Sequence, residues 1–319
     1  MSQDETPTPS KPAEVRKHYY LDRYTVIAPG RNKRPKQFDE EKPGARKQRK
    51  HHPIEDRPSL LEIPNEHDGW RVKVIQNDYP AFTVDNHQAR GTQEVVLETN
   101  RHDITFGQLA VDDIEAIVHA YQQRLQQLST QYNYVSIFKN HGYYSGASLN
   151  HSHSQIIATD IVPPQVAYER QVLTKYQHAH GSSPMCDVVR WELTQRKRVI
   201  AHTRYMTTIC PYASIAPLEV WIVPNRQAHS LADLSTEEVH SLSDHLKGVT
   251  MALAAKDIDF NYHVYEPAPD CYNHTFIQIV PRINIWGGFE LNTGMYMNTV
   301  SPEYATAWYQ QHIKTPDAV

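Results

Sequence analysis

Two histidines and a glutamine alternate in the segment Asn150–Ile157, which reads NHSHSQII. In an extended strand, side chains two residues apart lie on the same face. His151, His153 and Gln155 are therefore expected to lie side by side, with Ile156 on the opposite face. Two imidazoles and an amide fill an apolar core poorly, because their polar atoms need partners. They suit a metal ion, a phosphate group, or both.

A neutral imidazole is a good nucleophile toward phosphorus, and the phosphoramidate it forms divides one displacement into two. Such chemistry needs hydrogen-bond donors around the phosphoryl oxygens. The preceding loop, Gly142 to Ser148, can supply backbone amides, because its small residues let a backbone approach closely. Gln155, on the same face as His153, can donate an amide hydrogen bond to the same phosphate.

The elements that must hold this segment are strands and one amphipathic helix. Apolar residues at helical spacing predict a helix from about Asp112 to Thr130, with Asp112 as its N-cap. A second helix, 236–256, begins with a capping box of Ser235 and Glu238. Further expectations are a partly helical segment at 163–190, a final helix from residue 302, and strands at 72–75, 93–98, 134–138, 199–202, 207–210, 220–223, 262–264 and 275–280.

Several features recur in the same order in the two parts of the chain, which predicts a duplicated α+β unit. The matching pairs are Asn100-Arg101 with Asn225-Arg226, Asn133-Tyr134 with Asn261-Tyr262, and His151–Gln155 with His274–Gln278. The third pair differs in one respect, since His153 in the first copy corresponds to Phe276 in the second. If the chemistry needs an imidazole there, only the first copy can perform it. The second copy is then structural or serves ligand binding.

Composition excludes several classes of protein. The 319 residues carry a net charge of -4, so no basic field indicates a nucleic-acid partner. The three cysteines, Cys186, Cys210 and Cys271, form no CxxC pair, which favours a reducing compartment. No window approaches 18 apolar residues and the N-terminus lacks an apolar signal core, so we expect a cytoplasmic protein without a membrane span.

The segment following Gly146-Ala147-Ser148 resembles the histidine-triad superfamily, in the branch of galactose-1-phosphate uridylyltransferases and the related ADP-glucose phosphorylases. The resemblance extends over nearly the whole chain. It is carried by Arg31, Lys33, Arg34 and Pro35; Asn77-Asp78 with Pro80-Ala81; Phe138, Asn140 and Gly142; Pro211-Tyr212-Ala213, Pro217, Glu219, Trp221, Pro224 and His229; and Gly288-Phe289-Glu290 with Thr293-Gly294.

The resemblance implies an α+β fold of duplicated histidine-triad-like halves, with antiparallel sheets and flanking helices. The expected organisation is a disordered tail at 1–16, an N-terminal half at 17–162 that carries the active histidine, and a C-terminal half at 163–319 without one. It also implies a homodimer whose sugar site is completed across the interface.

Carried over position by position, the family pattern assigns roles to individual residues. His153 corresponds to the nucleophile that becomes nucleotidylated, and Gln155 and Ser148 to its phosphate contacts. The substrate contacts it implies are Arg31 and Arg34 to phosphate, Asn77, Asp78 and Asn140 to the nucleoside, and Glu290 to the sugar hydroxyls.

The implied reaction is ping-pong transfer of a nucleoside monophosphate between a nucleotide-sugar and a sugar 1-phosphate, as in galactose metabolism. One alternative uses the same nucleotidyl-His153 with inorganic phosphate or water as the acceptor. Another is a nucleotide-binding protein without catalysis, which the presence of His153, Gln155 and Ser148 argues against.

Many members of the family bind a structural zinc through C-P-x-C, a distant histidine and the first histidine of the triad. Here the C-P-x-C position reads His52-Pro53-Ile54-Glu55, and the two histidines correspond to His102 and His151. Imidazole and carboxylate ligands suit zinc and also other divalent ions. The alternative is a lost site, with His51-His52 solvated in a charged loop. No second metal is assigned near Glu169 and His274, because Phe276 replaces a histidine there.

Overall fold

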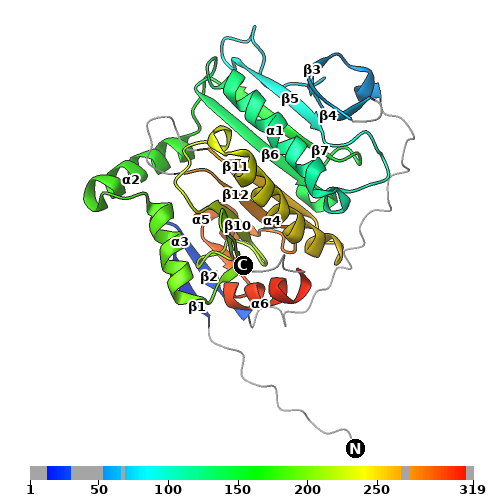
Figure 1. Cartoon of the computed structure of the whole chain (residues 1–319). Coiled ribbons are helices and arrows are strands. Elements are labelled where there is room, and N and C mark those ends of the chain that lie inside the picture. The colour runs from blue at the N-terminus through cyan, green and yellow to red at the C-terminus, as the bar shows by residue number, and fades with distance from the viewer. Residues whose placement is uncertain (1–12, 30–52, 66–68, 267–273, 314–319) are drawn as a thin grey trace, which may run out of the picture.

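One ten-stranded antiparallel sheet runs through both halves of the chain (Figure 1). The structure is a computed structural model that describes residues 13–29, 53–65, 69–266 and 274–313. The strands in spatial order are β3 (Ser59–Pro64), β4 (Trp70–Gln76), β5 (Gly91–Leu97), β7 (His153–Thr159), β6 (Tyr134–His141), β11 (Phe260–Tyr265), β12 (Phe276–Pro281), β10 (Val220–Pro224), β9 (Met206–Ile209) and β8 (Val199–His202).

The two halves of the sheet have equivalent strand orders when each is followed from its outer edge to the centre. From the two edges inward they are β3-β4-β5-β7-β6 and β8-β9-β10-β12-β11, and the two sets meet where β6 pairs with β11. In each set a long helix connects the third strand to the inner strand: α1 (Val111–Leu128) follows β5 and α4 (Thr236–Ala254) follows β10. The predicted α+β class with a large antiparallel sheet and flanking helices is therefore confirmed.

Cross-strand register tests the sequence repeat residue by residue. His153 and Phe276 are the first residues of β7 and β12, as the predicted match requires. Phe138 pairs with Gln155 and His263 pairs with Gln278, so Phe138 and His263 correspond. The sequence match of Asn133 with Asn261 is therefore out of register, because a shared Asn-Tyr dipeptide was a weaker guide than strand pairing.

Helices α1 and α4 lie side by side across one face of the sheet (Figure 1). Their apolar stripes and the inner sides of the strands form the main core, in which Ile117, Tyr121 and Leu253 are fully buried. The predicted capping box of α4 is present, since Ser235 Oγ accepts the Glu238 N–H at 3.3 Å. For α1 the N-cap is Ala110 instead of the predicted Asp112. The Asp113 carboxylate caps this first turn by accepting the Ala110 N–H at 3.2 Å.

In the part of the chain that the structure describes, the remaining elements are a small second sheet, four shorter helices and four 3-10 turns. They are the three-stranded sheet β1 (Glu14–Lys17), β2 (Tyr24–Ile27) and β13 (Tyr296–Asn298), the helices α2 (Pro164–His180), α3 (Pro184–Gln195), α5 (Gly288–Thr293) and α6 (Pro302–His312), and the 3-10 turns η2 (Pro53–Asp56), η3 (Phe106–Gln108), η4 (Tyr143–Ser145) and η5 (Leu231–Asp233). Within the described ranges, none of the helices has the length and apolar character needed to cross a bilayer.

Residues 14–16, at the end of the predicted disordered tail, are part of strand β1. Arg16, in β1, is 8% exposed and donates hydrogen bonds to Glu303 of α6 and to the Tyr212 carbonyl at 3.1 Å. These partners lie almost 200 residues or more away in sequence, so the short polar segment gave no local signal of order. The rest of the tail lies outside the described residues, and the division of the halves at residues 162 and 163 stays a prediction.

Candidate functional site

His153 begins β7 with its imidazole almost fully buried. Its Nδ1 lies 2.8 Å from the His151 carbonyl oxygen. A carbonyl only accepts, so Nδ1 donates its proton, and the neutral ring leaves Nε2 as the bare nitrogen. Burial lowers the pKa of His153, and the positive charge of Lys139 lowers it further. The fold therefore holds His153 neutral with its unprotonated nitrogen at Nε2.

A buried ion pair lies behind His153, on the core side of the sheet. Lys139 Nζ contacts the Glu98 carboxylate and donates to the His153 carbonyl at 2.8 Å. Ser152 Oγ closes the cluster by donating to Glu98 at 2.6 Å. The two charged side chains are 1% and 0% exposed. Sequence analysis missed this pair, although a charged residue in each of two apolar strands was a visible signal.

Gln155 has its amide orientation set by Gln93 of β5. Gln93 Nε2 donates to Gln155 Oε1 at 3.1 Å, which leaves Gln155 Nε2 as a donor on the His153 face. The Gln93 carbonyl also accepts the Asn77 N–H at 2.9 Å. Gln93 thus connects the predicted phosphate contact with the predicted nucleoside contact, and sequence reasoning did not single it out.

Asn77 and Asp78 follow β4 in a turn at this edge of the site. The Asn77 side chain accepts the Tyr79 N–H at 2.8 Å, a local bond that shapes the turn. Asp78 pairs with Arg57 through both carboxylate oxygens, at 3.1 Å each. The carboxylate of Asp78 is therefore already engaged by a protein cation.

The loop before β7 is held by the C-terminal half of the chain. Asp259 accepts the Tyr144 N–H at 2.8 Å, and Asn261 Nδ2 donates to the Asn140 side chain at 2.7 Å and to the Ser145 carbonyl at 2.9 Å. Asn140 Oδ1 is thereby occupied, which leaves its amide Nδ2 as the group that can donate to a ligand. Gly142 has φ +85°, and a Cβ there would stand 2.1 Å from Asp259 Oδ1, so only glycine fits.

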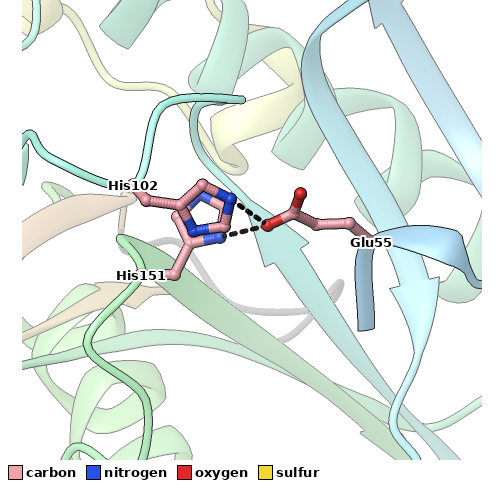
Figure 2. A group of neighbouring side chains, drawn as sticks. All are labelled: Glu55, His102 and His151. Atoms are coloured by element: carbon pink, nitrogen blue, oxygen red, sulfur yellow. Dashed lines mark ion pairs between the residues drawn. The ribbon is translucent and has the colours of Figure 1, made fainter. Parts of the chain in front are cut away.

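Glu55, His102 and His151 form a compact group of possible metal ligands. Their ligand atoms lie within 4.8 Å of one another. Figure 2 shows both imidazoles facing the Glu55 carboxylate, with Oε1 at 2.8 Å from His102 Nε2 and 3.1 Å from His151 Nδ1. The three residues come from η2, from the connection after β5 and from the residues just before β7. Three of the four predicted metal ligands therefore meet, and His52 lies outside the described residues.

The hydrogen bonding of His151 tests whether this group fits a metal. His151 Nε2 lies 2.6 Å from the Thr99 carbonyl and must donate to it, which leaves Nδ1 without a proton in the neutral ring. This Nδ1 is buried and has no hydrogen-bond partner, and burial lowers the pKa of the ring. A bare imidazole nitrogen directed at a carboxylate is the arrangement that a zinc site requires. The residues fit a divalent cation.

The other predicted residues are less closely gathered. Ser148 is the last residue of the active loop, the segment 142–148 before β7. Its side chain is exposed. Glu290 lies on α5, where its Oε2 accepts the Gly287 N–H at 2.9 Å and caps its own helix. Arg31 and Arg34 lie outside the described residues.

Comparisons with known proteins agree with this arrangement. Residues 8–163 match the family described as galactose-1-phosphate uridyl transferase, N-terminal domain. An ADP-glucose phosphorylase of Arabidopsis thaliana is 29% identical, with 91% of this chain and 90% of that protein aligned. A galactose-1-phosphate uridylyltransferase of Haemophilus influenzae is 30% identical over 72% of this chain and 70% of that protein. The crystal structure of an Arabidopsis thaliana ADP-glucose phosphorylase with bound ADP-glucose superposes with a TM-score of 0.84, at 28% identity, covering 96% of this chain and all (100%) of that one.

Proposed function

The chain belongs to the nucleotidyltransferase family of galactose-1-phosphate uridylyltransferases and ADP-glucose phosphorylases, and from this we propose a ping-pong nucleotidyl transfer through His153. The donor is a nucleotide-sugar, and the acceptor is a second phosphate. The observation that carries the proposal is the bond from His153 Nδ1 to the His151 carbonyl, because it leaves Nε2 without a proton and so able to act as the nucleophile.

In the first step His153 Nε2 attacks the phosphorus nearest the nucleoside. The N–P bond forms as the P–O bond to the sugar phosphate breaks, and the sugar 1-phosphate leaves with the electron pair. In the second step an acceptor phosphate oxygen attacks the same phosphorus, the N–P bond breaks, and the neutral imidazole returns. The His151 carbonyl stabilises the positive charge that the ring carries in the intermediate.

Donors around the phosphoryl group stabilise the charge that develops on its oxygens. Gln155 Nε2 is available because Gln93 occupies the opposite end of the amide. The Ser148 hydroxyl and the backbone amides of the loop supply further donors in the same role. Asn140 binds the nucleotide through its Nδ2, with Asn77 and Asp78 at the nucleoside, and Arg31 and Arg34 contact phosphate.

Two acceptors are compatible with this chemistry. With a sugar 1-phosphate the protein acts as a hexose-1-phosphate uridylyltransferase. With inorganic phosphate it acts as a nucleotide-sugar phosphorylase, and the extensive match to the Arabidopsis thaliana ADP-glucose phosphorylase favours this second candidate. Both acceptors would react with the same nucleotidyl-His153, so the two activities differ only in the second step.

A divalent cation, zinc in the first instance, is proposed at Glu55, His102 and His151, with His52 as the fourth ligand. When bound it supplies a structural cross-link. The residues themselves connect η2, the segment after β5 and the start of β7, two residues before His153. We also propose a homodimer, in which Glu290 contacts the sugar hydroxyls at a site completed by the partner.

Mass spectrometry of the intact chain tests the intermediate. The protein is incubated with labelled UDP- and ADP-sugars without acceptor, and the added mass identifies the nucleotide while the modified peptide identifies the residue. We expect labelling of His153, loss of labelling in His153→Ala, and normal labelling in His119→Ala, a control on α1. Labelling of another residue, or transferase activity of His153→Ala, would refute the mechanism. Adding glucose 1-phosphate, galactose 1-phosphate or inorganic phosphate then shows which acceptor discharges the label.

A further inference from the structure

A cavity of about 430 Å³ lies over the sheet of the C-terminal half. Gln278, Phe276 and His263 form part of its floor, and residues of the β1–β2 connection and of α2 cover it. Cross-strand partners point to the same face of a sheet. Because Gln278 pairs with His263, His263 with Phe138, and Phe138 with Gln155, the cavity opens on the sheet face that carries His153 in the other half.

The floor of this cavity corresponds to the active site of the N-terminal half. Phe276 occupies the position of His153, and Gln278 occupies the position of Gln155. The duplicated unit therefore places a cavity of metabolite size at the equivalent position, and it replaces the nucleophilic nitrogen with a phenyl ring. A ligand bound there has no imidazole at that position to react with.

Arg23 brings an uncompensated charge to the wall of the cavity. No hydrogen bond or ion pair of its guanidinium is found within the described part of the chain, and its Nε is buried without a partner. Arg23 is partly exposed, so its charge is still hydrated, and an anion in the cavity can supply the partner that its buried Nε lacks. The neighbouring rings do not share the charge, since burial and Arg23 together lower the pKa of His18 to about 3 and of His263 to about 4.

Glu169, Glu219 and Glu266 lie near this wall, and within the described residues none of them forms an ion pair with Arg23. Glu219 lies close enough for Arg23 to influence its pKa, but its two oxygens accept from Ile215 N–H at 2.5 Å, Trp221 Nε1 at 2.9 Å and Gln278 Nε2 at 2.6 Å. Burial raises the pKa of Glu219, and it raises that of Glu266, also on the cavity wall, to about 7. Burial thus shifts the titration of both acids toward protonation, and the carboxylate of Glu219 is engaged by three donors other than Arg23.

An aromatic platform lines the same cavity. The Tyr265 and Phe276 rings stack with centroids 4.8 Å apart, and Trp221 lies 5.1 Å from Phe276. Flat apolar surfaces of this kind bind the faces of sugar rings and nucleobases. Asn261 and Gln165 also line the cavity. Their amide nitrogens already donate within the protein, Asn261 to Asn140 and Ser145 and Gln165 to Glu169, so their side-chain carbonyl oxygens are the groups that can accept from hydroxyls.

We propose that this cavity is a second, non-reacting ligand site that binds a phosphate monoester with a ring-shaped body. Arg23 binds the phosphate, and the platform of Trp221, Tyr265 and Phe276 holds the ring. A sugar 1-phosphate and a nucleoside monophosphate share this chemistry, and they are distinguished as separate arms of the test. The site is distinct from the one at His153, so it stands whether or not His153 is nucleotidylated.

Titration calorimetry and crystallography of the full chain test the site with glucose 1-phosphate, AMP, inorganic phosphate and glucose as probes. We expect one of the two monoesters in density beside Arg23, with at least about tenfold weaker binding at this site in Arg23→Met, equivalent to about 1.4 kcal/mol. Arg23→Lys should bind with intermediate strength. The control Arg190→Met, at an exposed arginine of α3, should bind as the wild type does.

Several results would overturn the proposal. They are probe density only at His153, unchanged binding in Arg23→Met, glucose binding as tightly as its phosphate, or inorganic phosphate binding as tightly as both monoesters. Labelling of His153 by nucleotide-sugar is measured on the same Arg23→Met preparation and should be unchanged. Loss of that labelling would place Arg23 in the reacting site and would also overturn the proposal, whereas absence of labelling in the wild type would count only against the transfer mechanism.

Discussion

Replacement of Lys139 by methionine should destabilise the chain strongly. The change removes the only ion-pair partner that the structure records for Glu98 within the described residues, in a place where neither side chain is more than 1% exposed. Breaking a buried pair from one side costs about 3–5 kcal/mol, because the remaining charge must be neutralised or left unsolvated. The loss also frees the His153 carbonyl and Ser152 Oγ from their shared donor.

The cost should fall when the partner is removed as well. In the double variant Lys139→Met/Glu98→Met no buried charge remains, and flexible methionines can fill the space. We expect a coupling free energy of about 2 kcal/mol or more between the two positions. The free energy of unfolding is measured by urea titration followed by tryptophan fluorescence for the wild type, both single variants and the double variant.

A surface pair of similar geometry provides the control. Arg90 and Asp160 are joined at 2.6 Å, but their side chains are 45% and 38% exposed, so Arg90→Met should change stability far less. The reasoning fails if Lys139→Met unfolds as the wild type does, or if the double variant is no more stable than Lys139→Met. Either result would mean that water or a rearranged core already compensates Glu98.

Three further predictions concern the active loop, the metal group and the acid stability of the fold. Gly142→Ala should lower both the stability of the chain and the rate of His153 labelling. Gly146→Ala, at the same φ of +85° but with nothing within 4 Å of the new Cβ, should show only the left-handed backbone penalty of about 1–2 kcal/mol. Equal effects of the two variants in urea titration and labelling kinetics would contradict the role of the close contact. Glu55→Gln should lower the zinc content measured by plasma mass spectrometry and abolish any chelator-induced fall in unfolding temperature. The control Glu62→Gln, at a 45% exposed carboxylate on β3, should keep the zinc content and the chelator effect of the wild type. A zinc content unaffected by Glu55→Gln would exclude this residue as a ligand. Burial lowers the pKa of His245 from 6.5 to about 4. Its stabilising contribution is therefore complete above pH 6.5 and is lost as the pH falls toward 4, by about 1.4 kcal/mol per pH unit. His245→Gln should flatten this dependence of the unfolding free energy on pH in urea titrations, and an unchanged slope would contradict the assignment.

Local sequence patterns were sufficient for the elements that carry the site. The alternation of His151, His153 and Gln155 predicted an extended strand, and β7 contains His153 and Gln155, whereas His151 lies just before its first residue. The capping box of Ser235 and Glu238 located the start of α4 for a similarly local reason. The repeat, though read partly out of register, predicted a duplicated α+β fold, and the family resemblance was confirmed.

The predicted metal ligands come from three separate segments and were a harder case. The family pattern indicated Glu55, His102 and His151, and the fold brings all three together. The protonation of His151, which leaves Nδ1 bare, depends on the Thr99 carbonyl and could not be read from residue types. Tertiary structure alone sets which imidazole nitrogen faces the carboxylate.

The sequence by itself determined which residues can react: an imidazole at His153, none at Phe276, and a small-residue loop in front of the first. Only the tertiary structure decided how they are held. Asp259 and Asn261 reach the active loop across 115 and 116 residues of chain, Lys139 lies behind His153, and Arg23 meets the equivalent cavity of the other half. The physical reason is that periodicity and capping act within a few residues, whereas buried charges and amide orientations are set by partners that only folding brings into contact.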